Sequence, residues 1–239
     1  MALIEVKDLA KSFGQVRAVD GVSLHIEAGE FITLLGPSGS GKTTVLRLIA
    51  GFEDADKGSI TLSGEDITHL PPFDRDVNTV FQDYALFPHM SVAENIEYGL
   101  RVKGVAKNER RAQAENALAQ VRLSGYGDRK PHELSGGQRQ RIAIARAIVA
   151  DPRVLVLDDA TSAVDPTKEH EIRDALATVM RGRTTLVIAH RPATIELADR
   201  AVLLDNGVIA ASGSHHELLE TNEKYREVLA AMATPKVVE

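Results

Sequence analysis

One glycine-rich stretch constrains the fold of this chain more than any other part of its sequence: Gly36-Pro37-Ser38-Gly39-Ser40-Gly41-Lys42-Thr43-Thr44. It fits the pattern of a Gly, four further residues and then Gly-Lys-Ser/Thr, which is typical of a loop that binds phosphate. The apolar run Phe31–Leu35 before it predicts a buried strand. The residues after it repeat with helical spacing up to Gly51, which is well placed to end a helix. An ordinary glycine-rich turn is the alternative, but such a turn would not need a strand before it and a helix after it.

The position of this stretch, between a strand and a helix, suits the chemistry of phosphate binding. Backbone N–H groups of the loop and the positive end of the helix dipole can hold an anion. The Lys42 ammonium can neutralise the outer phosphates, and the Thr43 hydroxyl can ligate Mg²⁺. The sequence therefore predicts a nucleotide site at residues 36–44.

Composition narrows the remaining possibilities. The chain has 239 residues, 44% of them hydrophobic, which is enough for one sizeable core and a subdomain. Its formal net charge of -6 gives no reason to expect nucleic-acid binding. It has no cysteine, which excludes disulfides and thiolate metal sites, and the adjacent His215 and His216 have no metal-site partner and are expected to be solvated. The N-terminus does not resemble a secretory signal, and no apolar run approaches the roughly 18 residues of a membrane span. Any work at a membrane is therefore expected to go through a partner.

Strand and helix patterns alternate along most of the chain, which predicts an α/β fold with a mostly parallel sheet. Strands are expected at residues 3–6, 22–26, 31–35, 59–62, 77–81, 154–158, 185–189 and 201–204, with a turn at residues 11–14. Helices are expected after Asp165-Pro166 and after Pro192, and a helical tail should run from the capping box Ser214–Glu217 to about Met232. No internal repeat or low-complexity linker divides the chain, so we expect one compact unit.

The segment from residue 85 to about residue 133 interrupts this alternation. Ser91 and Glu94 form a capping box, and apolar positions between residues 108 and 123 repeat with helical spacing among many charges. These patterns predict a small helical insertion between two halves of an α/β core. A second capping box, Ser135 with Gln138, predicts that the next helix begins there.

An apolar strand that ends in an acid supplies the carboxylate that a phosphate loop needs. Asp158 follows the run Val154–Leu157, and we expect it to hold Mg²⁺ directly or through a water. Asp159 comes next, where a general base for an attacking water would lie. A strand that ends in Asp is weak evidence for a metal-binding carboxylate on its own, but it becomes strong evidence when the same chain also has the phosphate loop at residue 36.

A second phosphate site is predicted at Ser135-Gly136-Gly137-Gln138. Two glycines at a helix start let the backbone approach a ligand closely, and the helix N-terminus favours an anion. The helical insertion carries this segment away from the first loop, so one chain cannot easily use both. A symmetric head-to-tail dimer solves this problem, because each chain then caps the nucleotide of the other. A plain capped helix is the alternative interpretation.

The segment Leu134-Ser135-Gly136-Gly137-Gln138, lying between the glycine-rich loop and Asp158, resembles the signature of ATP-binding-cassette (ABC) ATPases, the motor domains of ABC transporters. The resemblance covers essentially the whole chain. It implies a P-loop NTPase fold with a RecA-like core, an antiparallel β subdomain and a helical subdomain, and dimerisation driven by ATP and Mg²⁺. We expect a single ABC ATPase domain at residues 1–239. Within it, residues 1–84 and 150–239 would form the β subdomain and core, and residues 85–149 the helical subdomain with the signature helix.

Further residues match motifs of this family one at a time. Phe13 matches the aromatic residue that stacks on adenine, although a lone Phe in a turn is more often part of a core. Gln82 matches the glutamine that contacts Mg²⁺ and the attacking water and that links the site to the helical subdomain. Asp165 ends Ser162-Ala163-Val164-Asp165, which resembles the loop that crosses the dimer interface. His190, at a strand end, matches the histidine that contacts the γ-phosphate.

Asp159 departs from the family pattern, which usually has Glu there as the base that orients water. Asp is one methylene shorter, and degenerate sites of some asymmetric ABC exporters resemble this one. The alternative to an active ATPase is therefore a chain that binds ATP and hydrolyses it weakly or not at all. The expected site consists of catalytic Lys42, Gln82, Asp159 and His190, metal-binding Thr43, Gln82 and Asp158, and nucleotide-binding Phe13, residues 36–44, Ser135, Gly136, Gly137, Gln138 and Asp165.

The family resemblance changes in kind along the chain. About the first 140 residues, notably residues 75–90, resemble importer ATPases of polyamine and ferric-iron uptake. About the last 95 residues, notably 158–165 and 188–192, resemble the nucleotide-binding domains of exporters. We hypothesise a hybrid chain, natural or engineered, joined near residues 138–153. A divergent natural sequence is the alternative.

Three functions compete at this stage. In a transport motor, residues near Gln82–Leu100 would form the wall of a groove that receives a transmembrane permease subunit. The chain would then lie in the cytoplasm, at the inner face of the cell membrane. A binding-only module would close as a dimer on ATP without turnover, and nucleotide turnover separates these two. A DNA-repair or chromosome-maintenance ATPase would need a long coiled-coil insertion, but the segment between Gln82 and Ser135 is short and has no sustained heptads.

Overall fold

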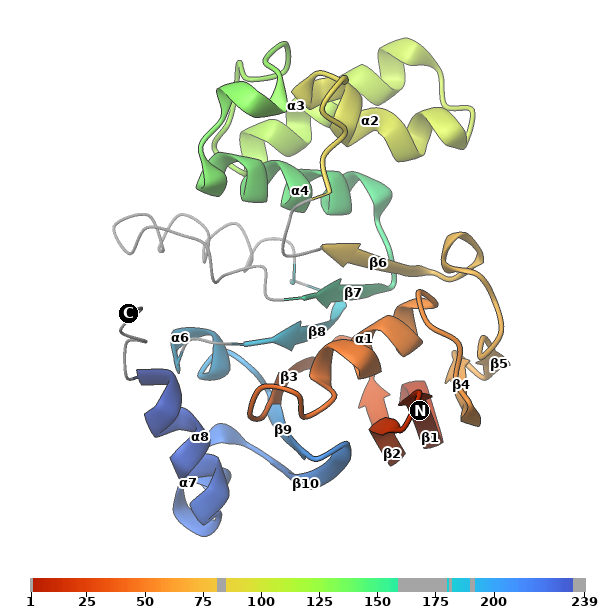
Figure 1. Ribbon diagram of the computed structural model, residues 1–239. Coiled ribbons are helices and arrows are strands. Elements are labelled where there is room, and N and C mark those ends of the chain that lie inside the picture. The colour runs from red at the N-terminus through yellow and green to blue at the C-terminus, as the bar shows by residue number, and fades with distance from the viewer. Residues whose placement is uncertain (1, 81–84, 159–179, 181, 190–191, 234–239) are drawn as a thin grey trace.

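Two sheets form the frame of the molecule in the computed structural model, which describes residues 2–80, 85–158, 180, 182–189 and 192–233 (Figure 1). The larger sheet has the strand order β10-β9-β3-β8-β7-β6. Its strands are β3 (Phe31–Leu35), β6 (Val77–Val80), β7 (Val154–Leu157), β8 (Thr184–Ile188), β9 (Arg200–Asp205) and β10 (Val208–Gly213). All neighbours pair in parallel except β10, which runs antiparallel to β9. The mostly parallel sheet and the α/β class are confirmed.

The smaller sheet is antiparallel and has the order β2-β1-β4-β5. Its strands are β1 (Ala2–Phe13), β2 (Val16–Glu27), β4 (Lys57–Leu62) and β5 (Glu65–Asp66). The hairpin β1–β2 is longer than predicted, and the expected turn at residues 11–14 is wrong. Phe13 pairs directly with Val16, because Gly14 adopts a φ of 59° and so permits a two-residue turn.

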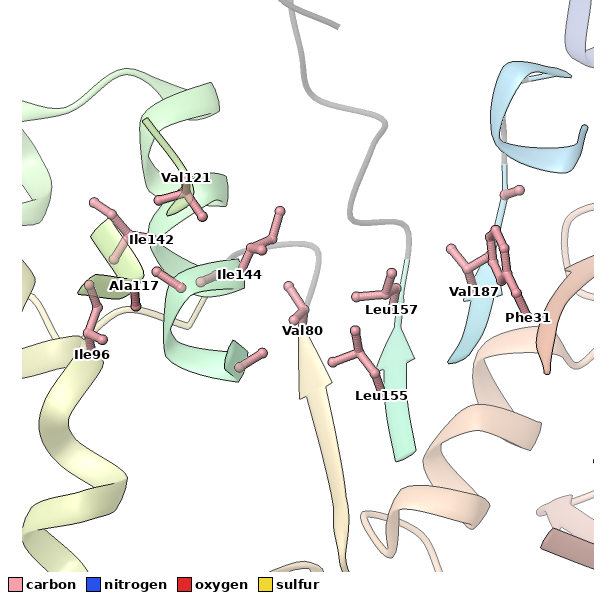
Figure 2. Close-up of a cluster of buried hydrophobic side chains, with 14 of the residues drawn as sticks. Phe31, Val80, Ile96, Ala117, Val121, Ile142, Ile144, Leu155, Leu157 and Val187 are labelled. Carbon is pink, nitrogen blue, oxygen red and sulfur yellow. The ribbon is translucent and has the colours of Figure 1, made fainter. Parts of the chain in front are cut away.

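The larger sheet is covered on both faces. On one face, α1 (Lys42–Ala50) and the antiparallel sheet enclose a core cluster that includes Ile32, Leu46 and Val156. On the other face a second cluster continues from Leu157 and Val187 of the sheet into the helices α2 (Val92–Val102), α3 (Lys107–Gln120) and α4 (Gly136–Ala150) (Figure 2). These three helices pack against one another and gather beyond β6 (Figure 1). Short 3-10 turns lie at Pro72–Asp74 and Pro131–Glu133.

Several helix ends form where local sequence signals predict them. Both bonds of the Ser91 capping box are present, with Ser91 N to Glu94 Oε2 at 2.6 Å and Glu94 N to Ser91 Oγ at 3.2 Å. Gly51 ends α1 with a φ of 81°, and its N–H donates to the carbonyls of Arg47 and Leu48. These caps satisfy terminal backbone groups that have no partner inside the helix.

The sequence pattern predicted one continuous helix in the C-terminal tail, but the structure has two. The tail divides into α7 (His215–Thr221) and α8 (Glu223–Ala233), because Asn222 is extended and its Oδ1 accepts a hydrogen bond from Tyr225 N at 2.8 Å. His215 is partly buried rather than fully solvated, and its Nδ1 lies 2.8 Å from the hydroxyl of the fully buried Tyr225. Burial raises the pKa of Tyr225 to about 12. The sequence patterns also failed to predict the strands β5 and β10.

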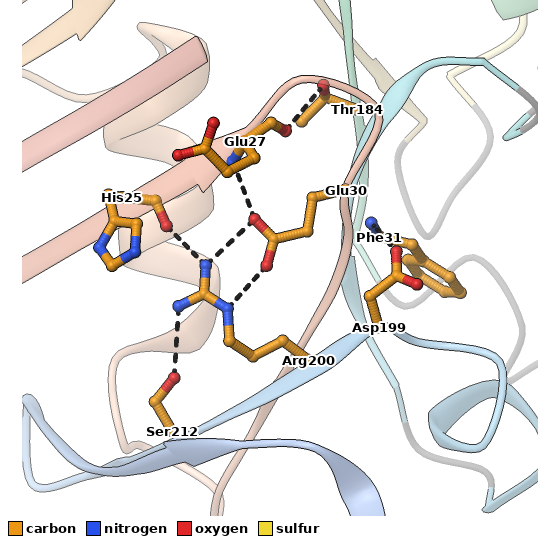
Figure 3. Close-up of polar contacts among 8 residues, drawn as sticks. All are labelled: His25, Glu27, Glu30, Phe31, Thr184, Asp199, Arg200 and Ser212. Carbon is orange, nitrogen blue, oxygen red and sulfur yellow. Dashed lines mark hydrogen bonds and ion pairs between the residues drawn. The ribbon is translucent and has the colours of Figure 1, made fainter. Parts of the chain in front are cut away.

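A polar network fastens the amino ends of the parallel strands (Figure 3). Arg200 Nε donates to Glu30 Oε1 at 2.7 Å, and Arg200 Nη2 donates to Glu30 Oε2 at 3.2 Å and to His25 O at 2.6 Å. Beside it, Phe31 N donates to Asp199 Oδ2 at 2.8 Å. Residues between β2 and β3 are thus tied to the start of β9, at the sheet edge opposite the glycine-rich loop. A further helix among the described residues, α6 (Pro192–Ile195), follows β8.

Among the residues described, we find no helix whose length and apolar character would let it cross a membrane.

Candidate functional site

The glycine-rich loop connects β3 to α1 and passes very close to two other backbones. A Cβ on Gly36 would lie 2.1 Å from Leu204 O, and one on Gly41 would lie 2.3 Å from Ala18 O. Both glycines have positive φ angles, 144° for Gly36 and 98° for Gly41. Residues with side chains cannot take these positions without displacing β9 or β2, so the glycines are required by geometry.

A turn from the other end of the chain braces this loop. Gly207 N donates to Ser40 O at 3.1 Å, and Gly207 O accepts from Asp20 N at 2.8 Å. Sequence reasoning missed this contact. The Asn206-Gly207 dipeptide is a hairpin signal that could have revealed the β9–β10 turn, but its partner in the loop is not encoded locally.

Lys42 lies inside the loop and is only 8% exposed. Its Nζ donates to Gly36 O at 2.9 Å, to Pro37 O at 2.7 Å and to Ser40 Oγ at 3.3 Å. The ammonium therefore holds the loop closed around the start of α1. Within the part of the chain that the structure describes, no side chain caps this end of α1, and its first turn has no acidic residue. The loop thus presents a positive charge and a helix N-terminus together, an arrangement that suits a phosphate.

Two of the three residues expected to bind metal, Thr43 and Asp158, lie side by side. Thr43 Oγ1, in the first turn of α1, is 3.4 Å from Asp158 Oδ1, although the residues are 115 positions apart in the chain. Asp158 follows β7, and its N–H donates to Val80 O at 3.1 Å. A hydroxyl and a carboxylate oxygen fit Mg²⁺, which takes few protein ligands and keeps waters and phosphate oxygens. No cluster of three His, Cys, Asp or Glu suited to another metal occurs among the described residues.

Phe13 lies at the tip of the β1–β2 hairpin and is 47% exposed. Lys11 Nζ is 5.4 Å from the centre of its ring. The hairpin tip is close to the phosphate loop, because Ala18, which packs on Gly41, is two residues from Val16, or roughly 7 Å along β2. An exposed aromatic ring beside the loop does not belong to either core cluster.

The predicted second phosphate site is the N-terminus of α4. Ser135 N donates to Gln138 Oε1 at 2.9 Å, and Gln138 N donates to Ser135 Oγ at 3.3 Å, so the capping box is present. The exposed Ser135 hydroxyl accepts in this cap and can still donate its proton to an anion. In Figure 1, β6 and β7 lie between α4 and α1. The chain therefore does not bring its two predicted phosphate sites together.

Four predicted site residues, Gln82, Asp159, Asp165 and His190, lie outside the described residues, as does the helix expected after Asp165-Pro166. Their roles stay predictions.

A groove of about 300 Å³ opens between the sheet and the helices α2 and α4. Phe52 and Pro72 line one side, and Phe87 and Tyr98 line the other, with their rings 4.7 Å apart. The fully buried Asn95 shapes this wall: its Oδ1 accepts from Phe87 N at 2.7 Å, and its Nδ2 donates to Phe87 O at 3.1 Å. Sequence reasoning placed a groove wall near residues 82–100, which includes Phe87 and Tyr98, but it missed Asn95, because a lone Asn in a helix gives no pattern.

The sequence of this chain matches a family model and several curated proteins. The family model described as ABC transporter matches residues 19–162. The chain is 49% identical over 218 residues to the uncharacterized ABC transporter ATP-binding protein YdcT of Escherichia coli (strain K12), covering 90% of this chain and 65% of YdcT. It is 48% identical over 221 residues to the spermidine/putrescine import ATP-binding protein PotA of Haemophilus influenzae (strain ATCC 51907 / DSM 11121 / KW20 / Rd), covering 91% of this chain and 59% of PotA.

The chain thus spans about three-fifths of the length of the curated relatives it matches. Each of these matches covers about nine-tenths of this chain. Both alignments therefore include residues 138–153, the segment in which the hybrid hypothesis places the junction between the importer-like and exporter-like parts.

Two solved structures share the fold. A bacterial Atm1-family ABC exporter with ATP bound has a TM-score of 0.83 and 32% identity, covering 98% of this chain and 42% of the exporter. The dimeric ATP-binding cassette MJ0796, in a post-hydrolysis state bound to ADP and Pi, has a TM-score of 0.80 and 29% identity, covering 88% of this chain and 98% of that one. The P-loop NTPase fold predicted from the sequence is confirmed.

Proposed function

This chain belongs to the ABC transporter family and is an ATP-binding domain of it, and from that premise we propose that it hydrolyses Mg·ATP to drive transport. The observation that carries the proposal is the convergence of Thr43 and Asp158, 3.4 Å apart, beside the Lys42 ammonium. A phosphate loop, a cation and two oxygen ligands for Mg²⁺ are the parts that phosphoryl transfer requires.

The chain's own residues would divide the work as follows. Thr43 and Asp158 would hold Mg²⁺, which, when bound, neutralises charge on the phosphates. Lys42 would release the carbonyls of Gly36 and Pro37 and donate to phosphate oxygens instead, and Phe13 would stack on adenine. Gln82, Asp159 and His190 would surround the γ-phosphate, with Asp159 orienting the attacking water. Because Asp is shorter than Glu, we expect turnover to be slow while ATP binding is preserved.

A second copy or a related domain would complete the site. The N-terminus of α4, with Ser135, Gly137 and the neighbouring Gln138, lies on the far side of β6 and β7 from α1, so it is suited to a nucleotide held by another chain. The dimeric structure of MJ0796 bound to ADP and Pi supports the pairing of two such domains, and a head-to-tail dimer would let each chain complete the site of the other. We also assign residues 85–149 to a helical subdomain that carries this helix into the dimer interface.

The groove at Phe87 and Tyr98 is the surface that suits a permease subunit. Its apolar walls lie between the sheet and α2, and Asn95 fixes the backbone of one wall. Binding to such a subunit would hold the chain at the inner face of the cell membrane. The 48% identity to a spermidine/putrescine import ATP-binding protein supports uptake as the direction of transport.

Hydrolysis and sizing together test this proposal. Phosphate release by the wild-type chain would be measured with Mg·ATP, and light scattering would be recorded with and without ATP and Mg²⁺. We expect measurable turnover and a dimer in the presence of Mg·ATP. Lys42→Met should abolish both, whereas the matched exposed variant Lys7→Met should change neither. A wild-type chain that stays monomeric in every condition would contradict the shared site.

A further inference from the structure

Arg75 is a buried cation just before β6, and it is only 5% exposed. Its guanidinium donates to four backbone carbonyls: Nη1 to Leu48 O at 2.7 Å and Ile49 O at 3.0 Å, Nε to Leu70 O at 2.7 Å, and Nη2 to Thr68 O at 3.0 Å. Among the described residues it forms no ion pair. Burial lowers the pKa of Arg75, and the charge of Asp54 opposes this effect.

Two of these carbonyls belong to the last turn of α1. The final carbonyls of a helix have no partner within it, so a cation placed there donates to them, at Leu48 O beside the Gly51 N–H, and complements the negative end of the helix dipole. Gly51 makes room for this contact, because a Cβ on Gly51 would lie 2.5 Å from Arg75 Nε. A side chain from another segment therefore fixes the C-terminal end of α1.

The opposite end of α1 carries Lys42 and Thr43, so the contact with Arg75 bears on the nucleotide site. Arg75 leads directly into β6, which pairs in register with β7 from Val77↔Val154 to Val80↔Leu157. Asp158 follows β7. Arg75 is thus a polar side-chain link, beside the apolar packing of α1 on β7, between the helix that carries Thr43 and the strand pair that carries Asp158. A helix of this length is a stiff rod of roughly 13 Å, so a shift at one end moves the other.

We infer that Arg75 is a positioning residue for the metal-binding half of the nucleotide site, holding Thr43 within reach of Asp158 through α1. The inference rests on the proposed function. It predicts a specific defect, because the phosphate loop keeps its own anchors at Ala18 and Gly207. Loss of Arg75 should weaken the contribution of Mg²⁺ to ATP binding more than ATP binding itself.

Nucleotide binding with and without metal tests this. The dissociation constant of a fluorescent ATP analogue would be measured in Mg²⁺ and in EDTA for the wild type, Arg75→Gln and Arg75→Lys, with unfolding curves recorded in parallel. Arg153→Gln is the matched control, because Arg153 is 62% exposed and pairs with the adjacent Asp76 without contacting α1 in any described bond. Electron paramagnetic resonance of Mn²⁺ bound with ATP would report on the metal ligands directly.

We expect Arg75→Gln to lower affinity in Mg²⁺ on the order of tenfold, the ratio that corresponds to about 1.4 kcal/mol, and to change affinity in EDTA by less than about twofold. The affinity of Arg75→Lys in Mg²⁺ should lie between those of the wild type and Arg75→Gln, because an ammonium cannot span the four carbonyls. It also provides the test if Arg75→Gln does not fold. Equal losses in Mg²⁺ and EDTA, or an unchanged Mn²⁺ signal, would overturn the inference. A wild-type chain that fails to bind Mg·ATP would instead overturn the proposed function.

Discussion

Replacement of Arg200 by Met tests what the network at the amino ends of the strands contributes to stability. Met keeps most of the apolar stem of the side chain and removes the guanidinium. The change deletes the paired bonds to Glu30, at 2.7 and 3.2 Å, and the bond to His25 O at 2.6 Å. The side chains of Arg200 and Glu30 are 19% and 15% exposed, so solvent can replace these contacts only in part.

The expected cost follows from this partial burial. Loss of one partner from a fully buried pair costs about 3–5 kcal/mol, whereas exposed pairs contribute about 1 kcal/mol or less. Glu30 also keeps one bond, from Glu27 N at 2.8 Å. We therefore expect Arg200→Met to lower the free energy of unfolding by about 2 kcal/mol, midway between the fully buried and the exposed cases. For a chain of this size the melting temperature should fall by about 4–8 °C.

Urea unfolding at pH 7 provides the measurement. The matched control is Arg17→Met, because the Arg17–Asp20 pair has similar geometry but side chains that are 65% and 45% exposed. The control should lose no more than about 0.5 kcal/mol. Glu30→Gln and the double variant would complete a thermodynamic cycle that isolates the coupling between Glu30 and Arg200.

The pH dependence gives a second readout. Burial alone would raise the pKa of Glu30, but hydrogen bonds from Arg200 and the Glu27 backbone, with the charge of Arg200, outweigh it and lower the pKa. A folded-state pKa below the unfolded value stabilises the protein at higher pH, and this stability is lost as the pH falls through the folded value. Arg200→Met should shrink this acid-side loss. A cost no greater than that of Arg17→Met, with an unchanged acid limb, would refute the reasoning.

Three further changes should give distinct results. Gly41→Ala places a Cβ 2.3 Å from Ala18 O and should weaken ATP binding by more than about tenfold in a fluorescence titration; unchanged affinity would contradict the close approach. Asn95→Leu removes the acceptor of the partly buried Phe87 N–H and one of the two bonds to Phe87 O, the other coming from Met90 N, and should lower the free energy of unfolding by about 1–3 kcal/mol in urea; a neutral change would be inconsistent with the bonds described. Asp159→Glu should raise steady-state ATP turnover at unchanged ATP affinity, and no gain would remove the idea that Asp159 is too short.

Local signals in the sequence were sufficient for several features of the site. The glycine-rich loop, the capping boxes at Ser91 and Ser135, and the end of α1 at Gly51 depend on residues a few positions apart, and all form as the patterns predict. The proximity of Thr43 to Asp158 was also expected, because residues at the carboxyl ends of parallel strands meet at one edge of the sheet.

The missed features depend on contacts between distant segments. Arg75 binds carbonyls of Leu48 and Thr68, and Gly207 binds Ser40, but backbone acceptors leave no trace in residue type. The break at Asn222 was missed because a helical pattern continues on both sides of it, and the cap becomes visible only once Asn222 Oδ1 is seen to accept from Tyr225 N.

The place of β3 in the larger sheet has a consequence for synthesis on the ribosome. β3 is synthesised well before its neighbours, because among the described strands it pairs only with β8 and β9, and its residues are buried throughout. About 150 residues separate the end of β3 from β8, so at about 5–20 residues per second both edges of this apolar strand wait roughly 7–30 s for their partners. An incomplete chain therefore carries an unpaired, aggregation-prone strand attached to a phosphate loop that cannot yet bind. A chaperone that shields the first hundred residues should raise the yield of folded protein more than one added after release.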